Sequence, residues 1–220
     1  MKETNKFQKF FVLGVLFIIP IVAYLYFSAG VHNFAKLPVL TKNISELSEF
    51  KDEDEKKIFL SDHITILSFF GSDLNSKYAN TFNLTHKIYS PYFEFDDLQF
   101  VIILPESSRD QVSALKKELE RVKDARKWNF IFGSPEAINT VFNSLQSVHK
   151  LDANLSSDFV FIIDKDKNLR GRDDDEDIGM LYGYDTANLA ELNDKMKDDV
   201  KVILAEYRLA LKKYSSNREI

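Results

Sequence analysis

The alternation of apolar and polar segments predicts a domain of interleaved strands and helices from residue 63 onward. Four short apolar runs are rich in β-branched and aromatic residues, as buried strands are. These expected strands cover residues 63–70, 98–104, 128–132 and 159–163. Between them, apolar residues recur every three or four positions, which is the spacing of one helix face. We therefore expect an α/β domain with a central sheet covered by helices on both faces.

Local signals mark where the expected helices begin and end. Residues 108–111 read Ser-Arg-Asp-Gln, which has the form of a capping box ahead of a helix that runs to Val122. Ser134 followed by Pro135 is typical of a helix start, with the serine as N-cap. The apolar spacing near the end of the chain predicts a long C-terminal helix over residues 187–214.

The N-terminal segment predicts a membrane anchor. Residues 10–35 contain no Asp, Glu, Lys or Arg, a run of 26 residues. As a helix this run would extend about 39 Å, which exceeds the hydrocarbon core of about 30 Å. We place a transmembrane helix at residues 10–30 and a tether at residues 31–43. The alternative is a cleaved signal peptide, but this run is longer than a usual signal core, and the bulky Phe27 stands where a small residue is preferred.

The charges beside the expected anchor predict its orientation. Lys2, Lys6 and Lys9 precede it, so the positive-inside rule places residues 1–9 in the cytoplasm. In this single-pass arrangement the main domain, residues 44–220, lies on the extracytoplasmic side, which is the periplasm in a bacterium. Its first part, residues 44–57, is polar and charged, and we expect a turn or hairpin that leads into the domain.

Composition excludes several kinds of chemistry. The 29 Lys and Arg residues against 34 Asp and Glu give a net charge of −5, which argues against a nucleic-acid partner held by a broad basic face. Cysteine is absent, and with it disulfides, thiol redox chemistry, cysteine nucleophiles and thiolate metal sites. The four histidines show no two- or four-residue spacing, so a histidine metal site would need long-range assembly.

The order of the expected elements resembles the thioredoxin superfamily, and within it the SCO family of membrane-anchored copper chaperones for cytochrome oxidase. The likeness covers about residues 37–172. It is carried by Leu37-Pro38-Val39-Leu40, Ile66 to Gly71, Pro105-Glu106 with Arg109-Asp110, Trp128 to Ile138, and Phe159 to Gly171. The resemblance implies a thioredoxin-like domain over residues 44–220, with a central mixed sheet flanked by helices and preceded by one transmembrane helix. Most of these residues form the fold, so they support fold more than function.

The positions that carry chemistry in that family differ here. After Phe-Phe-Gly the family places Cys-x-x-x-Cys, whereas this chain has Ser72 to Tyr78, with no thiol. The family's copper-binding histidine falls near Ser156-Ser157, and the usual cis-proline position falls near Asp158. We therefore expect no copper binding, no disulfide exchange, no catalytic residues and no cofactor or metal.

Two segments that contain several aspartates each have a structural and a functional interpretation. Residues 164–168 begin like an EF-hand calcium loop, but Leu169 stands where glycine is required and Asp175 where glutamate is, so a hairpin turn is the better prediction. Residues 172–185 form an acidic insertion with five consecutive acids, residues 173–177. The insertion is either a solvated loop or a patch that binds a divalent cation or a basic partner.

The resulting hypothesis is a membrane-anchored, redox-inactive, SCO-like protein that acts as an interaction, assembly or accessory module and not as an enzyme. The resemblance implies a role for a respiratory oxidase, so the expected partners are a lipid bilayer, through residues 10–30, and a membrane protein or respiratory complex. Interaction surfaces are expected in the acidic insertion and on the C-terminal helix. The residues concerned are Asp173, Asp174, Asp175, Glu176, Asp177, Tyr182, Tyr184, Tyr207 and Leu211. The alternatives are a structural subunit of a membrane complex and an enzyme that uses Asp73 with Lys77 in the former redox loop.

Overall fold

The computed structural model describes the backbone of residues 6–29 and 36–216, and the side chains of residues 9–25 and 36–209. The chain divides into two compact units, Met1–Ala35 and Lys36–Ile220. Each unit is described by itself.

The first unit contains one helix, α1 (Lys6–Ala29), with Pro20 inside it. Its large apolar side chains from Phe10 to Leu25 are exposed. Within the part of the chain that the structure describes, no helix combines the length and the apolar character that crossing a membrane requires. The transmembrane anchor expected at residues 10–30 is therefore not supported there. Residues 30–35, the end of that anchor and the start of the tether, lie outside the described residues.

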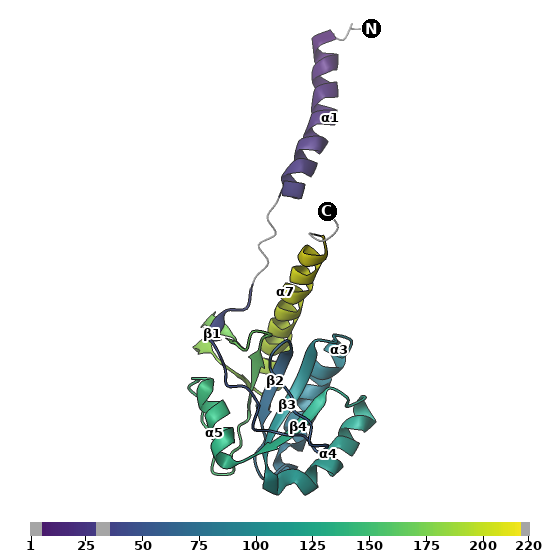
Figure 1. Cartoon of the computed structure of the whole chain (residues 1–220). Helices are drawn as coiled ribbons and strands as arrows, with labels where there is room; N and C mark the ends of the chain where they lie inside the picture. The colour runs from purple at the N-terminus through teal and green to yellow at the C-terminus, as the bar shows by residue number, and fades with distance from the viewer. Residues whose placement is uncertain (1–5, 30–35, 217–220) are drawn as a thin grey trace. The chain divides into compact units, whose positions relative to one another are not determined.

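The second unit is built on a seven-stranded mixed sheet, shown in Figure 1. Its strands are β1 (Val39–Thr41), β2 (Ile64–Phe69), β3 (Leu98–Pro105), β4 (Trp128–Gly133), β5 (Phe159–Ile163), β6 (Leu169–Arg170) and β9 (Tyr184–Asp185). The strand order is β1-β6-β5-β2-β3-β4, and β9 pairs with β5. β2, β3 and β4 are parallel, whereas β5 runs antiparallel to β2 and β6 antiparallel to β5. The four strands expected from apolar runs are confirmed, and the expected tether contains the short strand β1.

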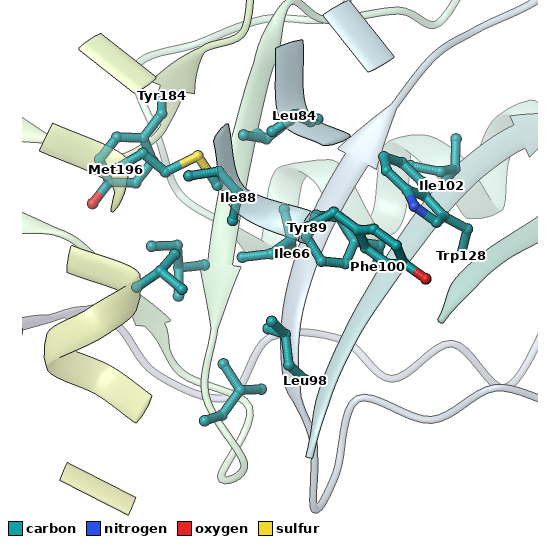
Figure 2. Close-up of a cluster of buried hydrophobic side chains, with 14 of the residues drawn as sticks. Ile66, Leu84, Ile88, Tyr89, Leu98, Phe100, Ile102, Trp128, Tyr184 and Met196 are labelled. Carbon is teal, nitrogen blue, oxygen red and sulfur yellow. The ribbon is translucent and has the colours of Figure 1, made fainter. Parts of the chain in front are cut away.

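One face of the sheet is covered by helices that follow β2 and β3 and by the C-terminal helix. η1 (Asn75–Lys77), α2 (Tyr78–Leu84), η2 (Thr85–Tyr89) and α3 (Ser90–Tyr92) follow one another directly, and α4 (Arg109–Val122) follows η3 (Glu106–Ser108). Tyr89 packs edge-on against Phe100, with ring centroids 5.1 Å apart, and Phe100 lies 4.8 Å from Trp128. Figure 2 shows these rings beside Ile66 and Ile88 in the core.

The opposite face is covered by α5 (Pro135–Ser144) and by the segment at residues 44–60. Ser134 caps α5 as expected, since its Oγ accepts a hydrogen bond from the Ala137 amide at 3.2 Å. The expectation that residues 44–57 form a polar turn or hairpin is only partly right. Ile44, Leu47 and Phe50 are buried among this second group of core residues. Three apolar residues spaced by three positions are enough to hold a polar segment against the sheet.

The C-terminal helix is confirmed, starting slightly later than expected. α6 (Leu189–Glu191), η4 (Leu192–Met196) and α7 (Lys197–Ser216) follow one another without a break. The Asn188 side chain caps the first turn by accepting hydrogen bonds from the amides of Ala190 and Glu191. The buried Arg170 joins this helix to the sheet, because its guanidinium pairs with Asp164 at 3.0 Å and with Glu206 of α7 at 2.6 Å.

The segment that resembles the start of a calcium loop is a hairpin turn, as expected. Asp164 Oδ1 accepts hydrogen bonds from the amides of Asp166 and Asn168, at 3.0 and 2.8 Å. Its other carboxylate oxygen accepts from Asn168 and Arg170. Both oxygens of this buried carboxylate are used within the protein, so the turn has a structural role.

Candidate functional site

The loop that follows β2 has a backbone conformation that only glycine fits. Gly71 has φ +67°, and a Cβ added there would lie 2.4 Å from the carbonyl oxygen of Asn154. The Ser72 amide donates to that same carbonyl at 3.1 Å. The loop is therefore fixed tightly against the segment that precedes β5.

The residues expected to cap α4 hold this loop instead. The Ser108 hydroxyl donates to the carbonyl of Gly71 at 2.9 Å, and Ser108 makes no side-chain cap to α4. Gln111 donates to the carbonyl of Ser72 at 3.0 Å and accepts from the Leu74 amide at 3.1 Å. The predicted capping box is therefore wrong, because a loop 37 residues away in sequence offers the same donors and acceptors in a buried setting.

Lys77 pairs with Asp158, in the segment that precedes β5, and not with Asp73. Its ammonium donates to Asp158 Oδ1 at 2.6 Å, and the Asn80 amide donates to the same oxygen at 3.0 Å. These hydrogen bonds, the one from Lys77 above all, hold the pKa of Asp158 below its ordinary value. Asp73 accepts from the Asn75 amide at 3.1 Å and so closes a local turn. The acid–base pair considered for an enzyme, Asp73 with Lys77, is not brought together.

The serines at the position of the SCO family's copper-binding histidine lack the donor atoms that copper prefers. Ser156 and Ser157 are both buried, and Ser157 Oγ accepts a hydrogen bond from the Phe159 amide. Hydroxyls lack the soft sulfur or imidazole donors that copper sites use. Among the described residues, no group of three or more His, Cys, Asp or Glu side chains could hold a metal ion.

The acidic insertion folds as a small hairpin. β7 (Arg172–Asp175) and β8 (Gly179–Leu181) pair antiparallel, with Arg172 opposite Leu181 and Asp175 opposite Gly179. The interpretation as a solvated loop is therefore only partly right. Strands form here despite the run of acids because three charged residues of the hairpin, Arg172, Asp175 and Asp177, find partners on η4 and α7.

These partners fix the hairpin to η4 and α7. Arg172 makes a bidentate ion pair with the buried Asp199. Its Nε donates to Oδ2 at 2.8 Å, and its Nη2 donates to Oδ1 at 3.1 Å. Lys195 bridges Asp175 at 2.7 Å and Asp177 at 2.6 Å. Burial alone would raise the pKa of Asp175, but the Lys195 ammonium and two backbone amides outweigh it and the pKa is lowered. The hairpin is thus held by directional, charge-assisted bonds.

The aromatic residues proposed for interaction lie in different settings. Tyr184 is buried and donates to Asp199 at 2.7 Å, so its prediction as a surface residue is wrong. Burial above all raises the pKa of its hydroxyl well above the ordinary value. Tyr182 and Tyr207 are half-buried against the core. Leu211 is in α7, and its side chain lies outside the described residues.

The outer part of the hairpin is exposed and carries both carboxylates and apolar side chains. Asp173, Asp174 and Glu176 are exposed, and Asp177 is exposed over 74% of its side chain. Ile178 and Met180 are 60% and 44% exposed. Sequence reasoning missed these two apolar residues, although each stands beside the acidic run. Asp175, by contrast, is buried and serves the fold.

Comparison with known proteins shows the fold of the second unit. No family model matches the chain, and no curated protein matches it. A putative electron transfer protein from Aquifex aeolicus VF5 is similar in structure, with TM-score 0.53, 14% identity, and coverage of 76% of this chain and 94% of that one. BsSco, described as a member of the Sco family of cytochrome c oxidase assembly proteins, is similar with TM-score 0.51 and 14% identity, covering 80% of this chain and 96% of its own. A putative protein disulfide isomerase from Bacteroides thetaiotaomicron is similar with TM-score 0.50 and 11% identity, covering 78% and 95%.

These similarities show a thioredoxin-like fold, as the sequence predicted. The chain carries this fold with no cysteine. It therefore has no thiol with which to exchange disulfides or to provide a thiolate ligand.

Proposed function

We propose that this chain is a redox-inactive, thioredoxin-like accessory module that acts by binding a partner protein through its acidic hairpin. The observation that carries the proposal is the outer face of the hairpin, residues 173–180, where exposed apolar side chains stand among exposed carboxylates. We call this the hairpin face. An apolar centre with a charged rim is typical of a protein interaction surface.

Because the hairpin is already attached to the helix, it loses little conformational entropy when a partner binds. Its ion pairs to Asp199 and Lys195 already hold the backbone in place before a partner arrives. Ile178 and Met180 supply an apolar anchor, and the Tyr182 hydroxyl lies 3.5 Å from the Met180 sulfur. The surrounding carboxylates attract a basic surface over a longer range. The partner surface that fits is therefore an apolar pocket flanked by Lys or Arg.

We propose a respiratory oxidase, or a protein bound to it during assembly, as the partner. This part of the proposal is supported by the resemblance of residues 37–172 to the SCO family and by the fold shared with BsSco. A structural subunit of a membrane complex is the second candidate, since it would use the same hairpin face. An assembly factor would be absent from the mature complex, whereas a subunit would be present in a fixed ratio.

Attachment to a lipid bilayer through residues 10–30, with the second unit on the extracytoplasmic side, is also a proposal. Exposed apolar side chains along α1 support contact with lipid, because water solvates such a surface poorly. Sodium carbonate extraction and protease treatment of intact spheroplasts test it. Release by carbonate, or protection of the second unit from protease until lysis in the presence of an accessible outer marker, would contradict it.

The binding proposal is tested by mild-detergent purification of the full chain from its own cells, with crosslinking and mass spectrometry. Replacement of Ile178 and Met180 by serine should lower recovery of oxidase subunits about tenfold or more, because apolar anchors dominate binding energy. The matched control replaces Phe59 and Val148 by serine, since these are also exposed apolar residues. Equal loss in both variants, or recovery of the wild-type chain as a lone monomer, would contradict the proposal.

A further inference from the structure

The segment that follows the hairpin face is packed against β5. Gly183 lies between β8 and β9, and a Cβ added there would come within 2.9 Å of the Phe161 ring and 3.1 Å of the Val160 carbonyl oxygen. Tyr182, the residue before it, is half-buried against the same group of core residues. Its hydroxyl lies 3.5 Å from the Met180 sulfur. The apolar end of the hairpin face therefore depends on how this part of the core is packed.

His149 completes this aromatic group from the loop after α5. Its ring stacks on the Phe159 ring, with centroids 3.7 Å apart and an angle of 23° between the ring planes. It also contacts the Phe161 ring edge-on, with centroids 6.0 Å apart. Phe159 begins β5 and is paired with Asp185 of β9, two residues after Gly183. His149, the start of β5 and the end of the hairpin thus form one contiguous set of contacts.

Burial outweighs the charges around His149. From β9, the Asp185 carboxylate favours the protonated ring. From β5, only the phenylalanine rings contact it, and Asp158, which precedes that strand, is paired with Lys77. Lys150 follows His149 in the chain and is exposed. The ring is half-buried, and this burial lowers the pKa of His149 from the ordinary value of 6.5 despite Asp185.

The two protonation states of His149 differ in how well they fit this position. A neutral imidazole packs on an aromatic ring as a flat group of low polarity, whereas an imidazolium needs water or an opposite charge close by. Protonation therefore favours a state in which the ring leaves Phe159 for solvent. That state uncovers Phe159 and removes one of the contacts of Phe161, against which Gly183 is packed.

We propose that His149 makes partner binding by the hairpin face dependent on pH. Above pH 6.5 the uncharged ring holds Phe159 and the end of the hairpin in the arrangement that binds. As the pH falls below 6.5, protonation turns the ring toward solvent, and the affinity for the partner decreases. This inference rests on the binding role proposed for the hairpin face. By linkage, a change that loosens the hairpin must also make His149 easier to protonate.

A nuclear magnetic resonance titration of the His149 imidazole in the full chain tests this coupling without a partner. The wild-type pKa should lie below 6.5. Asp199→Ala removes the acceptor of Arg172 and loosens the hairpin, so it should raise the pKa of His149 toward 6.5, although loss of a negative charge alone would lower it. The matched control Glu118→Ala removes one negative charge from α4 and should leave this pKa unchanged. An equal pKa in the wild type and in Asp199→Ala would overturn the proposal.

Partner recovery at pH 7.5 and pH 5.5 tests the consequence for binding. The wild type, crosslinked in its own cells, should recover about threefold less partner at pH 5.5. His149→Phe keeps an aromatic stack that cannot be protonated, so its recovery should be equal at both pH values. The matched control His86→Phe removes an exposed histidine of η2 and should respond to pH as the wild type does.

The two measurements separate failure of this inference from failure of the binding proposal. An equal loss of partner at pH 5.5 in His149→Phe and in the wild type would overturn control by His149. No recovery of a partner at either pH, together with the expected titration, would instead contradict the binding role of the hairpin face and the regulation that rests on it.

Discussion

At the scale of single residues, Gly71 and Lys77 fix the loop that follows β2. Gly71 permits the close approach of Asn154, and the buried Lys77 pairs with the exposed carboxylate of Asp158. The Lys77 side chain is 9% exposed and the Asp158 side chain 58%, so water screens the pair from one side. These contacts hold the loop against the segment that precedes β5. Gly71 and Lys77 therefore serve the fold.

The Gly71 conformation gives a prediction with a matched control. Gly71 and Gly179 both have positive φ, but an added Cβ meets the Asn154 carbonyl only at Gly71, and meets nothing within 4 Å at Gly179. We expect Gly179→Ala to lower the free energy of unfolding by about 1 kcal/mol, the cost of the left-handed conformation for alanine. Gly71→Ala should cost more, about 3 kcal/mol, because the backbone must also shift.

Urea unfolding of the two variants measures this difference. If Gly71→Ala were no less stable than Gly179→Ala, the close approach of the loop to Asn154 would be refuted.

At the scale of elements, the hairpin β7–β8 depends on the helix that follows it. Few of its residues reach the core, and its position is set by Arg172, Asp175 and their partners on η4 and α7. This explains how four exposed acids can stand on one small hairpin. Each buried charge has an opposite charge within hydrogen-bonding distance, and the exposed ones keep their water.

Asp199 is the side chain on which the hairpin most depends. It accepts from Arg172 and from Tyr184, so Asp199→Ala leaves a buried hydroxyl and a guanidinium without their acceptor. We expect a loss of about 3 kcal/mol in unfolding free energy and faster proteolysis within residues 172–185. The control Glu118→Ala breaks an exposed ion pair with Arg121 and should change stability by less than about 0.5 kcal/mol. Equal effects of the two substitutions would show that the hairpin is not held through Asp199.

At the scale of the whole molecule, a thioredoxin-like sheet is held together without any covalent crosslink. Core residues on both faces of the sheet, rich in phenylalanine, supply the stability. The chain carries an excess of five acidic residues over basic ones, and the hairpin presents four exposed carboxylates.

The stability of the whole molecule should depend on pH through His149. Its ring stacks on Phe159 with centroids 3.7 Å apart, and burial lowers the pKa of its imidazole from the ordinary 6.5. Above pH 6.5 both folded and unfolded chains carry the neutral ring. As the pH falls below 6.5, the unfolded chain gains the proton first, so the contribution of His149 to stability is lost.

Urea unfolding at pH 7.5 and pH 5.5 tests this expectation against the variant His149→Phe, which cannot be protonated. The wild type should lose more unfolding free energy between these pH values than the variant does. The carboxylates with lowered pKa, Asp158 and Asp175, lose their contributions only at lower pH, below their ordinary values near 3.8. An identical loss in both proteins would show that His149 remains protonated to the same extent on folding.

Part of the candidate site could be predicted from the sequence, and part could not. The acidic run pointed to residues 172–185 as a surface feature, and Asp173, Asp174 and Glu176 are indeed exposed. The acidic run by itself gives no sign that Asp175 is buried while its neighbours are exposed. Asp175 is accommodated there by its ion pair with Lys195, which lies 20 residues later in the chain. Tyr184 was misplaced for the same reason, since its partner Asp199 comes from another element.

The sequence by itself determined the core strands, the start of α5 and the absence of thiol chemistry. These follow from composition and from spacings of a few residues, because burying apolar side chains requires a repeating local pattern. Tertiary structure alone decided where the polar side chains bond. Ser108 and Gln111 hold a loop 37 residues away, and Lys77 pairs with an aspartate 81 residues away. A hydrogen bond is directional and short, so its partner is fixed only when the packed sheet brings distant segments within about 3 Å of each other.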